Sequence, residues 1–145
     1  MLESYAANGT GTVRGVKDRD KEIQIEFWQR AAKEGFSDER ARASAHKFRV
    51  DFDALDQRLA RHPYLMGESL SVLDIAWLIY AHRLSLGGYP FARLHPRVTM
   101  WMEKLRARPE FAEEIAMPPE AVRRLEATRR SQVETGKTLE AVAGF

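Results

Sequence analysis

The sequence predicts an all-α protein, a bundle of about five to six helices around a buried central helix at residues 71–86. Three observations support this prediction. Apolar residues recur at spacings of three and four over long stretches, as they do along one face of an α-helix. No stretch shows the alternation of apolar and polar residues that a sheet would need. All six prolines fall after residue 62, mostly between the periodic stretches, where they separate helices.

The first two predicted segments are a linker and a helix. Three glycines, Gly9, Gly11 and Gly15, crowd the first fifteen residues, so residues 1–16 are predicted to form a flexible segment. A helix is predicted over residues 18–34, and Gly35 terminates it. Its apolar face is spaced by four residues and lies along Ile23, Phe27 and Ala31, with Trp28 alongside.

A long amphipathic helix is predicted to follow, from an N-cap at Ser37 to Arg61. Its apolar residues form one stripe at spacings of three and four, and Pro63 ends it. The stripe consists of Ala41, Ala45, Phe48, Phe52, Leu55 and Leu59.

The central helix is predicted from a capping box. After the turn at Gly67, the Ser71 hydroxyl can accept the backbone N–H of Asp74, and the Asp74 carboxylate can accept the N–H of Ser71. The helix then reads IAWLIYA and is apolar on every side. A helix without a polar face must be surrounded by other helices, so this one is predicted to form the core.

Beyond a loop at residues 87–95, a helix is predicted to run to about Arg108. Its apolar face consists of Val98, Trp101, Met102 and Leu105, and a short turn with Phe111 follows. These elements complete a helical domain over residues 17–117. Residues 118–145 are predicted to form a last helix that packs on the bundle or frays from it.

Composition excludes several classes of protein. Apolar residues make up 44% and charged residues 30%, as in folded globular domains. Without cysteine, disulfides and zinc–thiolate sites are excluded. No apolar run approaches the roughly 18 to 20 residues of a membrane-spanning helix. The first residues lack the pattern of a signal peptide, so the expected location is cytoplasmic and no membrane partner is predicted.

The net charge is only +2, but the cations are unevenly distributed. Residues 82–108 hold six of them and one anion, Glu103. This segment is interpreted as a solvated rim, and an acidic partner or ligand is the alternative. Nucleic acid is not an expected partner, because the nearby aromatic residues fit the seam between helices. The six cations are Arg83, Arg93, Arg97, Lys104, Arg106 and Arg108.

No catalytic or metal site is predicted. Ser71, Asp74 and His82 are the residue types of a nucleophilic triad, but the first two are better used in the capping box. His82, on a mostly apolar helix, is interpreted as a hydrogen-bonded core residue. None of the four histidines has another histidine three or four positions away that would help to hold a metal. A phosphate loop ending at residues 136–138 is excluded, because Ser131 stands where its first glycine is required.

The order of these segments resembles the C-terminal helical domain of glutathione transferases. The resemblance covers residues 35–115. It rests on the long helix with the run Phe52-Asp53-Ala54-Leu55-Asp56 and on the run from Tyr64 to Trp77, in which the motif Gly67-Glu68-Ser69-Leu70-Ser71-Val72-Leu73-Asp74 opens a buried helix. It also rests on Arg108-Pro109-Glu110-Phe111. The later residues, 82–111, resemble bacterial members. In that family an N-terminal thioredoxin-like domain carries glutathione and a catalytic Ser, Tyr or Cys, and this sequence shows no such domain.

The resemblance implies a role on the electrophile side of a glutathione-conjugating site. Val13, Val16, Trp77 and Tyr80 are the residues expected to line a substrate pocket facing the thioredoxin-like domain. For Trp77 and Tyr80, core packing is the favoured interpretation, because each buries a large apolar area. No cofactor is expected in this chain, and glutathione is a co-substrate only where the thioredoxin-like domain is present. The chain alone is expected to be inactive.

Two functions remain open from the sequence. The chain is either the C-terminal half of a glutathione transferase-like protein or a stand-alone helical module for protein interaction. Both leave an apolar face near Ile23, Phe27 and Trp28 to be covered. The expected partners are a thioredoxin-like domain, another protein on that face, or a second copy in a homodimer.

Overall fold

The computed structural model describes residues 12–13 and 16–145. These residues fall into two compact units, with the boundary between Ser37 and Asp38. Eight helices and one two-stranded ladder lie in the described residues. Their bounds are β1 Thr12–Val13, β2 Val16–Lys17, α2 Arg19–Glu34, α3 Asp38–Leu59, α4 Val72–Leu86, α5 Phe91–Leu94, α6 Pro96–Arg106, α7 Pro109–Ile115, α8 Pro119–Glu134 and α9 Leu139–Ala143.

The first unit contains a short antiparallel ladder and one helix. Val13 pairs with Val16 in the ladder, within the segment predicted to be a linker. Each strand has only two residues, so the ladder does not amount to a sheet, and the all-α prediction is unaffected. Helix α2 forms at the predicted place, and the Asp18 carboxylate caps it by accepting the N–H of Lys21 at 3.0 Å. Residues 1–11 and 14–15, including Gly9, Gly11 and Gly15, lie outside the described residues.

The face of α2 differs from the predicted one at two positions. Ile25 is buried, whereas Ile23 is 52% exposed. Phe27 and Trp28 are half-buried, and their rings are in edge contact at 5.0 Å. The spacing of Ile23, Phe27 and Ala31 correctly predicted a helix but assigned Ile23 to the wrong side of it.

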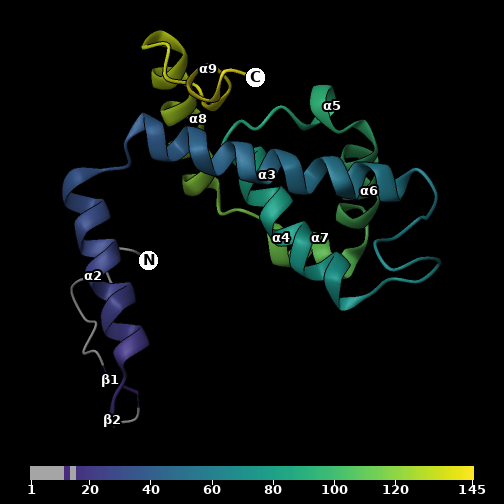
Figure 1. Cartoon of the computed structure of the whole chain (residues 1–145), viewed down its shortest axis with the longest axis horizontal. Helices are drawn as coiled ribbons and strands as arrows, with labels where there is room; N and C mark the ends of the chain where they lie inside the picture. Colours follow the sequence, from purple (N-terminus) through teal and green to yellow (C-terminus); the bar gives the residue numbers. More distant parts are fainter. Residues whose placement is uncertain (1–11, 14–15) are drawn as a thin grey trace. The chain divides into compact units, whose positions relative to one another are not determined.

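The second unit is built around α3, with α6 along the C-terminal half of that helix and α9 along its N-terminal half (Figure 1). Its core consists of side chains from α3, α4, α5 and α6, together with Leu65 and Tyr89 from the loops between them. Phe52 of α3 is fully buried at the centre and makes an edge contact with Phe91 at 4.8 Å. The predicted apolar face of α6 is confirmed, because its four members, Val98, Trp101, Met102 and Leu105, are all buried.

The loop expected at residues 87–95 contains a single helical turn, α5. It follows a tight turn at Gly88, whose φ of +87° favours glycine. Pro90 precedes α5, and the buried ring of Phe91 opens it. A four-residue helix has no periodicity that a sequence pattern could show.

Residues 118–145 form two helices, not the single one predicted. No residue of α8 is buried. In α9, Ala143 is 2% exposed, and its carbonyl is 3.0 Å from Nε2 of His46 on α3. The ring of Phe145 packs beside Tyr89 at 5.4 Å. This short helix therefore packs on the bundle, while α8 lies at the surface.

Candidate functional site

The helix that the sequence placed at the centre of the bundle, α4, is buried on one face only. Asp74, Leu78 and Ala81 are buried, at 0–2% exposure. The prediction that the helix is surrounded on every side is therefore wrong within residues 38–145. The opposite face is apolar and exposed, and we call it the outer face of α4. It consists of Val72, Leu73, Ile75, Ile79 and Tyr80, which are 42–76% exposed.

Two of the predicted substrate-binding residues lie on α4, and they have different environments. Trp77 is half-buried against the core, with its ring in edge contact with Phe52 at 5.4 Å. Tyr80 is 51% exposed, so the expectation that it packs in the core is wrong. The two rings are 5.9 Å apart. An indole that anchors the helix thus lies next to a phenol that faces outward.

The other two predicted substrate-binding residues belong to the first unit. Val13 and Val16 pair in the β1–β2 ladder, and Val16 is 70% exposed. Trp77 and Tyr80 belong to the second unit. The structure thus brings each pair together within its own unit.

The buried start of α4 is organised by Asp74. Ser71 and Asp74 form the capping box that the sequence predicts, and the Ser71 N–H donates to Asp74 Oδ2 at 2.9 Å. The Ser71 hydroxyl donates to the same oxygen at 2.6 Å. The other oxygen, Oδ1, accepts from the Leu65 N–H and from Trp101 Nε1, both at 2.9 Å. Asp74 therefore joins the loop, α4 and α6 in one hydrogen-bond network.

This network also sets the protonation state of Asp74. Burial favours the neutral carboxyl, but the hydrogen bonds from Ser71, Leu65 and Trp101 outweigh it and hold the pKa of Asp74 below its ordinary value. The carboxylate is thus ionised at neutral pH with all its near donors satisfied. A group of this kind positions backbone and has no free oxygen for proton transfer to a substrate.

Gly67 has a separate role in the same loop. Its φ of +124° is one that residues with a Cβ rarely adopt. There the chain turns back, with the Tyr64 N–H donating to the Gly67 carbonyl at 3.1 Å and the Gly67 N–H donating to the Tyr64 carbonyl at 3.2 Å. The turn presents the N–H of Leu65 to Asp74. Gly67 thus supports the capping box without belonging to it.

A second buried carboxylate, Asp56 on α3, was not singled out from the sequence. Its Oδ1 accepts the backbone N–H groups of Arg97 and Val98 at 2.8 and 3.1 Å, and its Oδ2 accepts from Arg97 Nη1 at 2.9 Å. Because α6 starts at Pro96 and has no side-chain cap of its own, Asp56 caps it from another helix. One signal was present, since position 56 lies on the apolar stripe of Phe52, Leu55 and Leu59.

His82 is hydrogen-bonded, as predicted, although it is half-buried and not in the core. Arg106 Nη2 lies 2.9 Å from His82 Nδ1 and also donates to the Ser85 hydroxyl at 2.8 Å. A guanidinium can only donate, so Nδ1 must be the unprotonated acceptor. Burial and the charges of Arg106 and Arg83 accordingly lower the pKa of His82.

His95 is the other buried imidazole. Its Nε2 lies 2.9 Å from the Tyr89 hydroxyl, and its Nδ1 lies 3.4 Å from Oδ1 of Asp53. Burial raises the pKa of Tyr89 to about 12, so this phenol stays protonated and can donate to the ring. Burial also lowers the pKa of His95, against the pull of Asp53 and Asp56. The folded protein therefore favours neutral His95.

We expect this imidazole to make stability depend on pH. Because the pKa of His95 is lower in the folded state than in the unfolded chain, unfolding takes up a proton below about pH 6.5. The free energy of unfolding should therefore fall as the pH is lowered from 7 to 5. His95→Gln should flatten this slope in urea unfolding, leaving the share of His82, whose pKa is also lowered in the folded state. An unchanged slope would show that His95 does not titrate on unfolding.

The described part of the chain, residues 12–13 and 16–145, has no group of three or more His, Asp or Glu side chains placed to hold a metal ion. Nor does any helix in this part have the length and apolar character needed to cross a membrane.

The comparisons with known proteins agree with this architecture. Residues 38–104, from the start of α3 to near the end of α6, match the family model described as glutathione S-transferase, C-terminal domain. This part of the chain is a glutathione S-transferase C-terminal domain. The matched residues contain both Asp56 and Asp74, and the match ends before α7, α8 and α9. No curated protein and no solved structure matches the chain.

Proposed function

We propose that the chain is the helical half of a glutathione S-transferase-like assembly, whose other half is a thioredoxin-like domain. In this proposal the outer face of α4 is the docking surface, and Tyr80 contributes to the electrophile side of a pocket that forms on docking. The observation that carries the proposal is the exposed apolar stripe on a glutathione S-transferase C-terminal domain. Monomeric proteins seldom leave a large contiguous apolar patch in water.

The position of the stripe supports a docking role. Val72, Ile75 and Ile79 are spaced at i, i+3 and i+7, so they lie along one side of α4. Tyr80 lies beside them and is backed by Trp77, which anchors the helix in the core. An exposed apolar stripe with an aromatic residue beside it has the composition that is typical of the buried part of a protein interface.

The side chains of α4 that could activate a thiol are already occupied, so thiol activation would fall to the partner. Asp74 is occupied by four donors, and the His82 ring is held by Arg106. Neither group is placed to activate a thiol. The thioredoxin-like domain would therefore supply both the glutathione site and the activating residue, as the family resemblance implies.

We expect the isolated chain to conjugate no glutathione to 1-chloro-2,4-dinitrobenzene above the uncatalysed rate. The physical reason is that the Asp74 carboxylate and the His82 ring, the groups on α4 that could accept a thiol proton, are held by other hydrogen bonds. The measurement is product absorbance over a series of protein concentrations. Turnover that scales with protein concentration and survives repurification would overturn the proposal that the thioredoxin-like domain supplies the glutathione site and the activating residue.

The outer face of α4 should also drive self-association when its partner is absent. In sedimentation velocity, we expect the average mass to rise with concentration, and Ile79→Glu to return the chain to a monomer by placing a charge on the apolar stripe. Val133→Glu is the matched control, because Val133 is 68% exposed on α8. Monomeric behaviour of the parent chain, or equal effects of the two variants, would count against this surface.

The second candidate function is a stand-alone interaction module, and the same exposed stripe favours it. The two candidates differ in one result. A thioredoxin-like domain that binds glutathione should restore conjugation when it is added to the chain if the first proposal holds. It should bind without turnover, or fail to bind, if the chain serves only for protein contact.

A further inference from the structure

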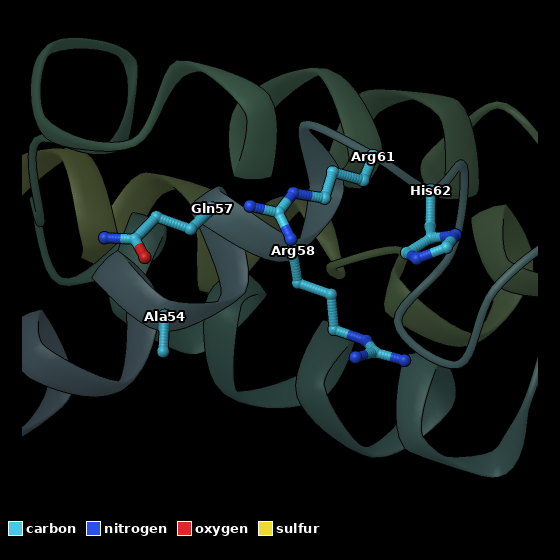
Figure 2. Close-up of a pocket in the computed structure, with 5 residues that line it drawn as sticks. All are labelled: Ala54, Gln57, Arg58, Arg61 and His62. Carbon is cyan, nitrogen blue, oxygen red and sulfur yellow. The ribbon is translucent and has the colours of Figure 1, made fainter.

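A surface pocket at the C-terminal end of α3 is not used by the function proposed above. Its volume is about 260 Å³, and it is lined by Ala54, Gln57, Arg58, Arg61 and His62 (Figure 2). The first four of these are spaced at i, i+3, i+4 and i+7. They therefore share one face of the end of α3 and of the turn that follows it. This face lies away from the buried stripe that contains Phe52 and Leu55.

Apart from Ala54, every side chain that lines this α3 pocket carries a hydrogen-bond donor, and none is a carboxylate. Gln57 offers an amide, His62 an imidazole, and Arg58 and Arg61 offer two guanidinium groups. The two arginines are three residues apart, and like charges at this spacing repel each other. An anion between them would turn this repulsion into two favourable contacts.

Structural roles account for only part of this cluster. Arg58 Nε donates to the Leu65 carbonyl, and its charge lies in the last turn of α3, where the helix dipole favours cations. The Arg61 guanidinium, in contrast, has no hydrogen-bond or ion-pair partner among residues 16–145, and only the backbone N–H of Arg61 is bonded, to the Arg58 carbonyl at 3.0 Å. His62 Nδ1 is buried without a hydrogen bond, and the nearest carboxylate, that of Glu68, is 3.6 Å away on a side chain that is 81% exposed.

The nearby acids of α3 are engaged elsewhere. Asp53 faces His95, and Asp56 caps α6. A second, smaller pocket of about 170 Å³ shares His62 and adds two further cations, Arg97 and Lys104. Both belong to the basic segment 82–108. Arg97 is paired with Asp56, so Lys104 is the cation of this segment that adds positive charge beside the α3 pocket.

We propose that the α3 pocket binds the phosphate group of a small phosphomonoester. Two guanidinium groups carry the charge that a phosphate dianion requires, and their planar N–H pairs suit its oxygen atoms. The pocket is slightly smaller than the roughly 300–1,000 Å³ of most small-molecule sites, which favours a ligand of few atoms beyond the phosphate. Its open side leaves the organic part of the ester in contact with solvent.

The test is calorimetric titration of the full chain at constant ionic strength, with glycerol 3-phosphate and with inorganic phosphate as probes. Arg61→Gln should weaken binding of glycerol 3-phosphate about tenfold or more, since it removes one of the two bidentate contacts. It should leave the melting temperature unchanged, because the Arg61 side chain has no partner in residues 16–145 and the substitution keeps the backbone N–H that donates to the Arg58 carbonyl. Arg124→Gln, at an exposed site on α8, is the control and should leave the affinity unchanged.

The outcomes separate the alternatives. Tighter binding of the ester than of inorganic phosphate supports the proposal in full. Equal binding of the two, still lost in Arg61→Gln, supports the phosphate site and identifies the free ion as its ligand. Equal weakening by Arg61→Gln and Arg124→Gln would show diffuse charge attraction and overturn the proposal. So would the absence of binding at millimolar concentrations of both probes.

Discussion

Asp74→Ala is expected to lower the free energy of unfolding by about 3 kcal/mol or more, because it removes the acceptor for buried donors on three segments. The N–H groups of Leu65 and Ser71 and the indole of Trp101 would lose their partner. Each buried donor left unsatisfied costs about 1–3 kcal/mol, against a total stability of about 5–15 kcal/mol for a domain. Urea unfolding followed by tryptophan fluorescence measures the loss.

Three further variants test the interpretation. Ser71→Ala should cost less, about 0.5–2 kcal/mol, and the double variant should cost less than the sum of the two, because both side chains serve one network. Glu120→Ala is the control, since Glu120 is an exposed acid in the first turn of α8. If Asp74→Ala unfolds like the parent chain, the network is not what holds α4 in place.

The pH dependence gives a second measure of the same group. Because hydrogen bonds hold the pKa of folded Asp74 below that of the unfolded chain, its stabilisation is present above the unfolded pKa. It is lost as the pH falls through the folded value. We therefore expect the parent chain to lose stability below about pH 4 more steeply than Asp74→Asn does.

The sequence predicted the parts of this fold that depend on near neighbours. The apolar stripe of α3 and that of α6 were found from spacing alone, because periods of three and four report a helix directly. The box of Ser71 and Asp74 was found because its two residues lie three positions apart. The family resemblance had the same origin, since its motif spans residues 67–74.

What the sequence could not predict depends on residues far apart in the chain. Nothing near Asp74 indicates that Leu65 and Trp101 share its other oxygen. The same limit applies to the outer face of α4. Its apolar composition predicted a helix buried on every side, and this is wrong within residues 38–145, where one face is exposed. Composition records what a helix can bury, and only the arrangement of its neighbours shows what is buried.

The α3 pocket illustrates a different limit. The spacing of Gln57, Arg58 and Arg61 is visible in the sequence, but charged residues on an exposed helix face are usually only solvated. What distinguishes the pocket is that the Arg61 guanidinium and His62 Nδ1 have no hydrogen-bond partner among residues 16–145. A carboxylate at position 54 or 57 on that face would pair with the arginines and leave no site for an anion.

Asp56→Ala is expected to lower the free energy of unfolding by about 2–3 kcal/mol, because it uncaps the N-terminus of α6. The Val98 N–H is buried and would be left without an acceptor, and the N–H of Arg97 would have to turn to water. Asp51→Ala, on the exposed side of the same helix, is the control and should change stability by less than about 0.5 kcal/mol. Both losses can be measured by urea unfolding.

The size of this effect depends on which of two contacts of Asp56 dominates, the cap or the ion pair with Arg97. The Arg97 side chain is 48% exposed, so its ion pair is screened by water and is worth at most about 1 kcal/mol. Arg97→Gln removes the charge and keeps the backbone N–H that Asp56 accepts. We therefore expect it to cost less than half as much as Asp56→Ala. Equal losses in the two variants would mean that the ion pair, and not the cap, holds α6 against α3.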